Sequence, residues 1–140
     1  MEARRPYCEL IDRLKAAGLR PTRQRLALAR LLFGRGDRHL TAEQLHGEAV
    51  AARVPVSLAT VYNALHQFTA TGLLREVIVE PGRSYFDTNV ANHHHFFHED
   101  CGHLEDIAGE DIRLGDLPAP PKGKRIRRVD VIIRVQDGDR

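Results

Sequence analysis

The stretch Ser57-Leu58-Ala59-Thr60-Val61-Tyr62-Asn63 decides the fold that this sequence predicts. It follows Val54-Pro55-Val56, where the proline interrupts the preceding segment. The helical pattern then continues to about Thr71, immediately before Gly72. We therefore predict a helix that begins at Ser57 and ends at about Thr71.

The two faces of this helix differ in chemistry. Small and amide side chains, Thr60 and Asn63 among them, occupy one face, and no acidic residue interrupts it. Amides can pair with base edges whereas carboxylates would repel phosphates, so this face suits the major groove of DNA. The apolar stripe on the other face consists of Leu58, Val61, Leu65 and Phe68.

Three segments before this helix and a hairpin after it complete the first predicted domain. Helices are expected between residues 7 and 17, from 21 to 33, and from a capping box at 41–44 to about 52, and strands at 73–79 and 84–87. Short helices followed by a β-hairpin are typical of a winged helix-turn-helix, here with an additional leading helix. The same pattern also fits a small helical domain with an ordinary solvated polar face.

Charge is distributed unevenly along the chain, although the net charge is only +2. Residues 1–75 contain 12 lysines and arginines against 6 acidic residues, whereas residues 76–140 contain 9 against 13. This asymmetry favours a polyanion-binding module joined to a cation-binding one. The basic cluster that favours DNA consists of Arg20, Arg23, Arg25 and Arg30.

The second half of the chain is dominated by the stretch Asn92-His93-His94-His95-Phe96-Phe97-His98. Five of the eight histidines lie between His93 and His103, a density that indicates a metal, haem or proton sensor. His93 and His95 are two residues apart, so on a strand they project from one face, whereas His94 projects from the other.

A small sheet is expected around these histidines. Strands are predicted at 92–98, 103–107 and 125–135, with a stiff proline-containing linker at 117–123. A sheet this small is marginal alone, so we expect it to be completed across a dimer interface. The predicted fold class is α+β, with a winged helix-turn-helix domain at 1–88 and a small α/β dimerisation and sensing domain at 89–140.

Composition excludes several classes of protein. No apolar run approaches the roughly 20 residues that span a membrane, and no apolar segment follows Met1 to form a secretory signal. The two cysteines, Cys8 and Cys101, suit a reducing compartment better than a disulfide scaffold. We expect Cys8 to pack against a neighbouring helix, and Cys101 to be either a buried small residue or a relic of a lost motif. We therefore expect a cytoplasmic protein that does not contact a membrane.

Four motifs resemble the ferric uptake regulator superfamily: residues 18–25, 40–44, 57–63 and 85–88, the last followed by a His-x-His cluster. The resemblance covers roughly residues 10–110. Residues 55–63 and the triple histidine are most similar to the iron response regulator (Irr) branch of alphaproteobacteria. The resemblance implies a dimeric winged-helix transcription regulator of iron or haem homeostasis, not an enzyme, that binds an A·T-rich operator in double-stranded DNA.

The resemblance also implies DNA contacts. The helix from Ser57 corresponds to the recognition helix and Tyr62 to a tyrosine that contacts bases. Arg20 corresponds to a basic residue that enters an A·T-rich minor groove. Many members have arginine where this chain has Asn63, a departure that fits an altered operator. The candidate DNA contacts are Arg20, Arg23, Ser57, Thr60, Tyr62 and Asn63.

The family's regulatory metal site implies five ligands here: His39, Asp87, His93, His95 and Asp106. Imidazole and carboxylate ligands suit Fe(II), Mn(II) or Zn(II). His39 taken alone would be a surface histidine near a helix start, and only the motif context makes it a ligand. Paired Cys-x-x-Cys motifs, which hold a structural zinc in most members, are missing, so a zinc held by four cysteines of one chain is excluded.

The triple histidine further implies haem, with His93, His94 and His95 as candidate ligands. Family resemblance implies action on DNA when iron is scarce, and inactivation or degradation when haem is plentiful. It also implies contact with an enzyme of haem biosynthesis, and assembly as a homodimer or a tetramer. His103 has no obvious partner in the sequence and is expected to be solvated.

Three other functions remain open. A peroxide- or manganese-sensing repressor of the same superfamily would use the same ligand pattern. A small metallohydrolase would need an open metal position and a general base, and no histidine motif here supplies a recognised one. A metal-buffering protein would show no salt-dependent, sequence-selective binding to DNA.

Overall fold

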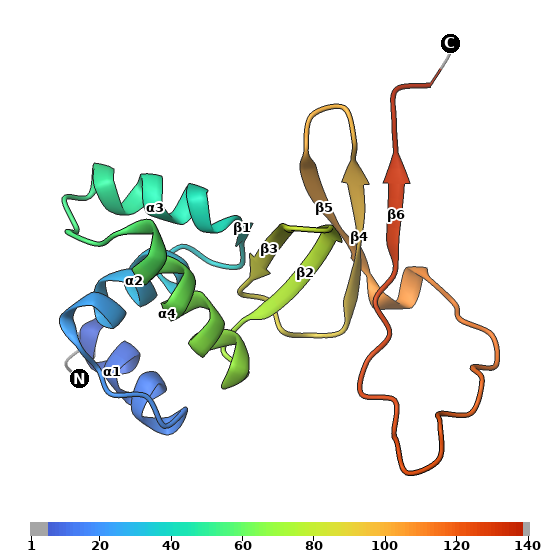
Figure 1. Cartoon of the computed structure of the whole chain (residues 1–140), viewed down its shortest axis with the longest axis horizontal. Helices are drawn as coiled ribbons and strands as arrows, with labels where there is room; N and C mark the ends of the chain where they lie inside the picture. The colour runs from blue at the N-terminus through green and yellow to red at the C-terminus, as the bar shows by residue number, and fades with distance from the viewer. Residues whose placement is uncertain (1–5, 139–140) are drawn as a thin grey trace, which may run out of the picture. The chain divides into compact units, whose positions relative to one another are not determined.

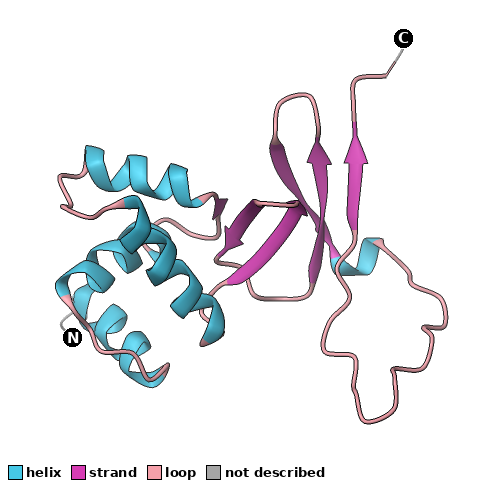
Figure 2. Cartoon of the chain, in the orientation of Figure 1, coloured by secondary structure: helices cyan, strands magenta, loops and turns pink. Residues whose placement is uncertain are grey.

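The computed structural model describes residues 6–138 (Figure 1, Figure 2). The chain divides into two compact units, the first ending at Val90 and the second beginning at Ala91. In the described part of the first unit the elements are α1 (Pro6–Ala16), α2 (Arg23–Phe33), β1 (His39–Leu40), α3 (Ala42–Ala51), α4 (Leu58–Ala70), β2 (Arg75–Glu80) and β3 (Arg83–Asp87). Those of the second unit, up to residue 138, are β4 (His93–His98), β5 (His103–Ala108), the 3-10 turn η1 (Gly109–Asp111) and β6 (Ile132–Val135). The predicted α+β class is confirmed.

The apolar faces of the four helices meet in one core. The stripe predicted on α4 is the centre of it, because Val61, Leu65 and Phe68 are fully buried and Leu58 packs against them half-buried. Removal of this apolar surface from water is the main stabilising contribution to the first unit. The other large side chains of this core that are fully buried are Leu14, Leu28, Leu32, Leu40, Leu45 and Phe86.

Side-chain caps fix where α3 and α4 begin. Thr41 Oγ1 accepts a hydrogen bond from the Gln44 N–H (3.1 Å), and Gln44 Oε1 accepts one from the Thr41 N–H (2.8 Å), which is the predicted capping box. Ser57 Oγ accepts a hydrogen bond from the Thr60 N–H (3.1 Å) at the start of α4. The predicted beginnings of both helices are therefore confirmed.

The turn between α3 and α4 contains a strained residue. Arg53 has a φ of 59°, in the left-handed region that disfavours residues with a Cβ. The turn is held by hydrogen bonds from the Arg53 N–H to the Val50 carbonyl (3.1 Å) and from the Val54 N–H to the Ala49 carbonyl (2.8 Å). Because this turn joins the two helices of the helix-turn-helix, it sets the direction in which α4 leaves α3.

The wing is a three-stranded sheet in the order β1-β3-β2. Strands β2 and β3 are antiparallel, and their turn contains Gly82 with a φ of 75°, which glycine adopts at no steric cost. Strand β1 was not predicted, because two residues are too short to show a periodic pattern. Its pairs with β3 are His39 with Asp87 and Leu40 with Phe86. The winged-helix prediction is confirmed, with this additional edge strand.

The second unit is a sheet in the order β5-β4-β6, antiparallel between β5 and β4 and parallel between β4 and β6. The predicted strand at 125–135 is wrong over most of its length, because only Ile132–Val135 pairs, opposite residues 95–98 of β4. β-branched residues favour a strand but cannot extend it beyond the available partner. Cys8 and Cys101 are both exposed, which corrects the expectation of a helix-packing Cys8 and excludes the buried alternative for Cys101.

Across residues 6–138, every helix is too short and too polar to traverse a lipid bilayer. The longest, α4, has 13 residues, fewer than the roughly 20 that a spanning helix needs.

Candidate metal centre and nucleic-acid interface

The β4–β5 hairpin brings three of the predicted metal ligands together. His95 and Asp106 are register partners and His93 lies two residues before His95, so the three side chains share one face of the sheet. Asp106 Oδ1 lies 3.3 Å from His95 Nε2 and 3.7 Å from His93 Nε2, and the two imidazole rings have centroids 4.6 Å apart.

The separation of 3.3 Å matches that between ligands of one metal ion, and the separation of 3.7 Å is slightly longer. Metal–nitrogen and metal–oxygen bonds of about 2.0–2.2 Å imply about 3.0–3.5 Å between neighbouring ligand atoms. One ligand atom from each of His93, His95 and Asp106 lies within 4.8 Å of the others. The histidines are buried, whereas Asp106 is half-exposed. Two imidazoles and a carboxylate fit a divalent ion such as Fe(II), Mn(II) or Zn(II).

A backbone contact fixes which nitrogen of His93 is available to a metal. His93 Nδ1 lies 2.7 Å from the carbonyl oxygen of Ala91. A carbonyl can only accept, so Nδ1 carries the proton and the lone pair of the neutral ring lies on Nε2. Nε2 is also the atom nearest Asp106. Metal-binding histidines are commonly oriented in this way by a carbonyl on the other nitrogen.

The remaining two predicted ligands lie in the first unit, on neighbouring strands of the wing. His39 and Asp87 are register partners of β1 and β3, so their side chains leave the sheet on the same face. Asp87 is buried, and its Oδ1 accepts a hydrogen bond from the Asn89 N–H at 2.9 Å. His39 is half-buried, and its ring lies edge-on to Tyr85 with centroids 6.3 Å apart.

His94 has a different environment from its neighbours. Its ring is buried on the opposite face of β4, and Nδ1 accepts a hydrogen bond from the Val131 N–H at 3.1 Å. The neutral ring then carries its proton on Nε2. Coordination of haem iron by Nδ1 of His94 would break the bond that ties the chain before β6 to β4. His103, expected to be solvated, is exposed, with its ring 5.4 Å from that of His98.

The residues predicted to contact DNA lie just before and at the start of α2, at the N-cap of α4, and in its first two turns. Arg20, Arg23, Ser57 and Asn63 are exposed, whereas Thr60 and Tyr62 are half-buried. Two of these side chains also have local partners. Ser57 Oγ lies 2.9 Å from Thr60 Oγ1, in addition to its contact with the helix backbone.

Arg25 joins the approach to α2 to the exposed face of α4. Its guanidinium donates to the Arg20 carbonyl (2.9 Å) and, through two nitrogens, to Gln67 Oε1 (2.9 and 3.2 Å). The Gln67 amide, on the polar face of α4, is therefore engaged within the unit. The contact ties the Arg25 side chain to the backbone at Arg20.

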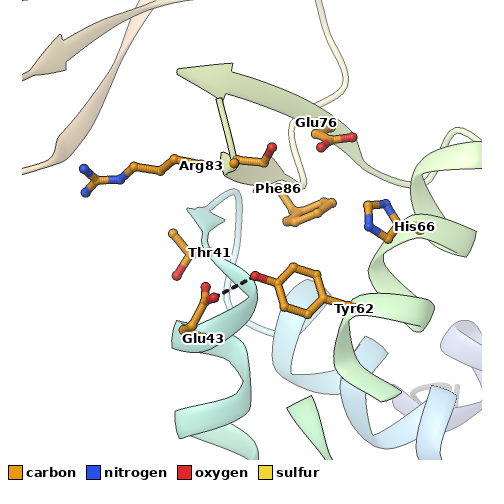
Figure 3. A pocket seen from close by; sticks show the side chains of 9 residues that line it. Thr41, Glu43, Tyr62, His66, Glu76, Arg83 and Phe86 are labelled. Atoms are coloured by element: carbon orange, nitrogen blue, oxygen red, sulfur yellow. Dashed lines mark hydrogen bonds between the residues drawn. The ribbon is translucent and has the colours of Figure 1, made fainter. Parts of the chain in front are cut away.

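Glu43 is the residue that the sequence prediction missed. The Tyr62 hydroxyl donates a hydrogen bond to Glu43 Oε1 at 2.6 Å (Figure 3). This bond raises the pKa of Tyr62 and lowers the pKa of Glu43, because it stabilises the neutral phenol and the ionised carboxylate. The two residues are 19 positions apart on different helices, so no local pattern relates them; the only sequence signal is an acid inside the capping box of α3.

Tyr62 and Glu43 border an open hollow of about 490 Å³ between α3, α4 and the wing (Figure 3). His66 lies one turn after Tyr62, with the two rings nearly parallel (21°) and their centroids 6.2 Å apart. The hollow is lined by Thr41, Glu43, Tyr62, His66, Glu76, Gly82, Arg83, Ser84 and Phe86. The side chain expected to contact bases is thus held between an acid and a second aromatic ring.

The fold and the site define a winged-helix protein joined to a small sheet that carries a histidine–carboxylate donor set. The ferric uptake regulator family model matches residues 16–117 of the chain. The chain belongs to this family, whose members are transcription regulators and not enzymes.

Individual relatives agree with this assignment. The chain is 37% identical over 100 residues to the peroxide-responsive repressor PerR of Staphylococcus epidermidis, a match that covers 71% of this chain and 65% of that protein. It is 36% identical over 100 residues to the ferric uptake regulation protein of Cupriavidus metallidurans, covering 71% and 70%. The match therefore spans about two thirds of the length of these relatives.

Solved structures show the same fold. The ferric uptake regulator from Pseudomonas aeruginosa with manganese superposes with a TM-score of 0.70 at 24% identity, covering 93% of this chain and 98% of that one. The Campylobacter jejuni peroxide stress regulator has a TM-score of 0.60 at 22% identity, covering 97% and 98%.

Proposed function

We propose that this chain is a DNA-binding transcription regulator whose operator binding depends on a divalent metal ion, Fe(II) or Mn(II). The observation that carries the proposal is the convergence of His93, His95 and Asp106 on one face of the β4–β5 hairpin. The same chain carries a winged helix whose recognition helix α4 has no acidic residue. Because one chain carries both a set of metal-binding side chains and a surface suited to DNA, we infer that the metal controls DNA binding.

The proposed ligand set is His39, Asp87, His93, His95 and Asp106. The first two belong to the first unit and the other three to the second. Only six positions separate Asp87 from His93 in the sequence. An ion that takes ligands from both units would restrain one against the other, and paired DNA-binding domains must match half-sites about one helical turn apart. These histidines and carboxylates would hold the ion, whose positive charge would offset the repulsion between the two carboxylates; Zn(II) fits the same donors.

The proposed partners are a second copy of the chain and an A·T-rich operator. In the described part of the second unit, β5 and β6 are the edge strands of a three-stranded sheet. A sheet of this size gains stability from a partner, which supports a homodimer, with a tetramer as the larger alternative. Exposed Arg20 at the approach to α2 is suited to an A·T-rich minor groove. A regulator of chromosomal genes would work in the cytoplasm.

A peroxide sensor is the second candidate, and the 37% identity to a peroxide-responsive repressor supports it. In that case iron-catalysed oxidation should modify the ligand histidines. Peroxide added to the Fe(II)-loaded protein should add oxygen to His39 or His93, detected by mass spectrometry, while the Mn(II)-loaded protein stays unmodified. An unmodified Fe(II) protein that still binds its operator would exclude this candidate.

Haem is the third effector to test, and the resemblance of the triple histidine to the Irr branch supports it. The proposed haem ligands are His93, His94 and His95, and the proposed partner is an enzyme of haem biosynthesis. The His94 bond to the Val131 N–H opposes haem at that ring. The test compares wild type with a variant in which all three histidines are replaced by alanine, both with haem added. If the two proteins have the same visible spectrum and the same DNA affinity, haem bound at these histidines is not the effector.

The experiment that tests the proposal begins with selection of a binding sequence from random duplex DNA by the Mn(II)-loaded protein. Fluorescence anisotropy then measures affinity for the selected duplex without metal and with Mn(II), Fe(II), Zn(II) or haem. The proposal expects an A·T-rich palindrome and at least about tenfold tighter binding with Mn(II) or Fe(II). Selection of no sequence, or equal affinity with and without metal, would contradict it.

A further inference from the structure

Residues 122–128 form the most basic stretch of the second unit. Their sequence, Lys122-Gly-Lys-Arg-Ile-Arg-Arg128, contains five positive charges and no acid. They lie in the irregular chain that joins η1 to β6, and all seven residues are exposed. We refer to residues 122–128 as the basic segment.

The basic segment is held outside the sheet. Prolines at 118, 120 and 121 precede it and restrict the chain to extended conformations. A tight turn follows, in which the Lys124 N–H donates to the Pro121 carbonyl at 2.9 Å and Gly123 has a φ of 78°. Ile126, the one apolar side chain of the segment, is 46% exposed. The segment therefore contributes little to packing.

Most of its charges form no ion pair with the described residues 6–138. Arg128 pairs with Asp130, with Nε 2.9 Å from Oδ1. Among residues 6–138 the structure shows no ion pair for Lys122, Lys124, Arg125 or Arg127. Outside the segment, residues 91–140 contain ten acidic residues against three basic ones. The segment thus concentrates positive charge in a unit that is otherwise acidic.

We propose that the basic segment is a second DNA-contacting element, which binds the phosphate backbone beside the operator and reads no bases. This inference rests on the proposed function, because it assumes that double-stranded DNA is already a ligand of the chain. Five lysines and arginines without an acid among them suit a polyanion, and arginine binds phosphate through two parallel N–H groups. The acidic remainder of the unit would repel DNA, and the segment would offset that repulsion.

Binding to phosphates has a defined signature. Each neutralised phosphate releases counterions, so the logarithm of the binding constant falls with the logarithm of salt concentration by about 0.9 per phosphate. A protein that neutralises fewer phosphates should therefore show a flatter salt dependence. Since phosphates are the same in every sequence, operator and random DNA should lose affinity by the same factor.

The test compares wild type with the variant Lys122→Gln, Lys124→Gln, Arg125→Gln and Arg127→Gln. Anisotropy measures binding of the full chain to the selected operator and to a random duplex at several salt concentrations. The variant should bind both duplexes about tenfold or more weakly at 0.1 M salt, with a salt slope smaller by about 0.9 for each phosphate that it no longer neutralises. The matched control, Arg125→Lys with Arg127→Lys, keeps the charge and should resemble wild type.

The outcomes separate this inference from the proposed function. An unchanged affinity and salt slope in the glutamine variant would overturn the inference while leaving metal-dependent operator binding intact. Absence of any DNA binding by wild type would overturn both. Binding to vesicles of phosphatidylglycerol and phosphatidylcholine is measured in parallel. If the wild type binds these vesicles, the variant does not, and the salt dependence of DNA binding is unchanged, the segment binds a lipid surface and the inference is overturned. Because the segment is unpacked, the thermal midpoint of the variant should match wild type.

Discussion

The hydrogen bond between Tyr62 and Glu43 gives the most specific prediction about the DNA-reading surface. It joins the tyrosine expected to contact bases to an exposed acid on α3 at 2.6 Å. In Glu43→Gln the amide oxygen can still accept the hydroxyl proton, but the negative charge is removed. We expect the pKa of Tyr62 to fall toward that of free tyrosine, and the affinity for DNA to rise.

The exposure of Tyr62 and Glu43 to solvent limits both the free energy of their hydrogen bond and the change in DNA affinity. A hydrogen bond to a charged group contributes about 1.5–3 kcal/mol in a protected site, and solvent screening reduces this to about 0.5–1 kcal/mol here. Removal of one negative charge beside the bound phosphates should tighten binding by a similar free energy, about two- to fivefold at low salt.

The same bond sets a pH window for stability. The pKa of Glu43 is lowered, so its contribution is present above the pKa of an unfolded glutamate and is lost as pH falls through the folded value. The pKa of Tyr62 is raised, so its contribution is present below the pKa of an unfolded tyrosine and is lost as pH rises through the folded value. The bond therefore stabilises the first unit between about pH 4.3 and 10.

The assay is an NMR titration of the tyrosine 13Cζ shifts, combined with anisotropy on the selected duplex. Glu76→Gln is the matched control, because it removes a charge from the same hollow and leaves the Tyr62–Glu43 bond in place. If Tyr62 titrates identically in wild type and Glu43→Gln, the bond does not form in solution and the reasoning is refuted.

Three further predictions concern single side chains. Phe68→Ala should lower the free energy of unfolding by about 3–5 kcal/mol, because Phe68 is fully buried. Urea denaturation measures this change, and a decrease under about 1 kcal/mol would contradict the prediction. Arg53→Gly should raise the free energy of unfolding by up to about 1 kcal/mol, because glycine has no Cβ to oppose the left-handed conformation, whereas Arg53→Ala should not raise it. Equal free energies of unfolding for the two variants would show that the backbone at residue 53 is not strained. Arg20→Ala should weaken DNA binding and reduce the salt slope by about 1, and a retained slope would show that Arg20 does not bind DNA.

Local signals explain why most of the first unit could be predicted. The caps at Thr41 and Ser57 involve residues three positions apart, and the apolar stripe of α4 repeats every turn, so both can be seen in a short window of sequence. The same holds for His93 and His95, whose shared face follows from strand alternation.

Features that depend on distant partners could not be predicted. The strand predicted at 125–135 satisfied β propensity, yet β6 is limited to Ile132–Val135; in this register residues 125–129 would lie beyond His93, the first residue of β4. The Tyr62–Glu43 bond and the His94 contact with Val131 join residues 19 and 37 positions apart. The orientation of His93 by the Ala91 carbonyl is local, but it depends on a side-chain rotation that the sequence pattern does not specify.

The central claim is that metal bound at the β4–β5 hairpin controls DNA binding. The most direct test is the Mn(II) concentration needed for half-maximal binding to the selected operator, measured for wild type, Asp106→Asn and His103→Ala. The asparagine keeps the shape of the ligand and removes its charge, whereas His103 is an exposed histidine on the same hairpin. Asp106→Asn should need at least about tenfold more Mn(II), and His103→Ala should match wild type. An unchanged Mn(II) requirement in Asp106→Asn would contradict the account.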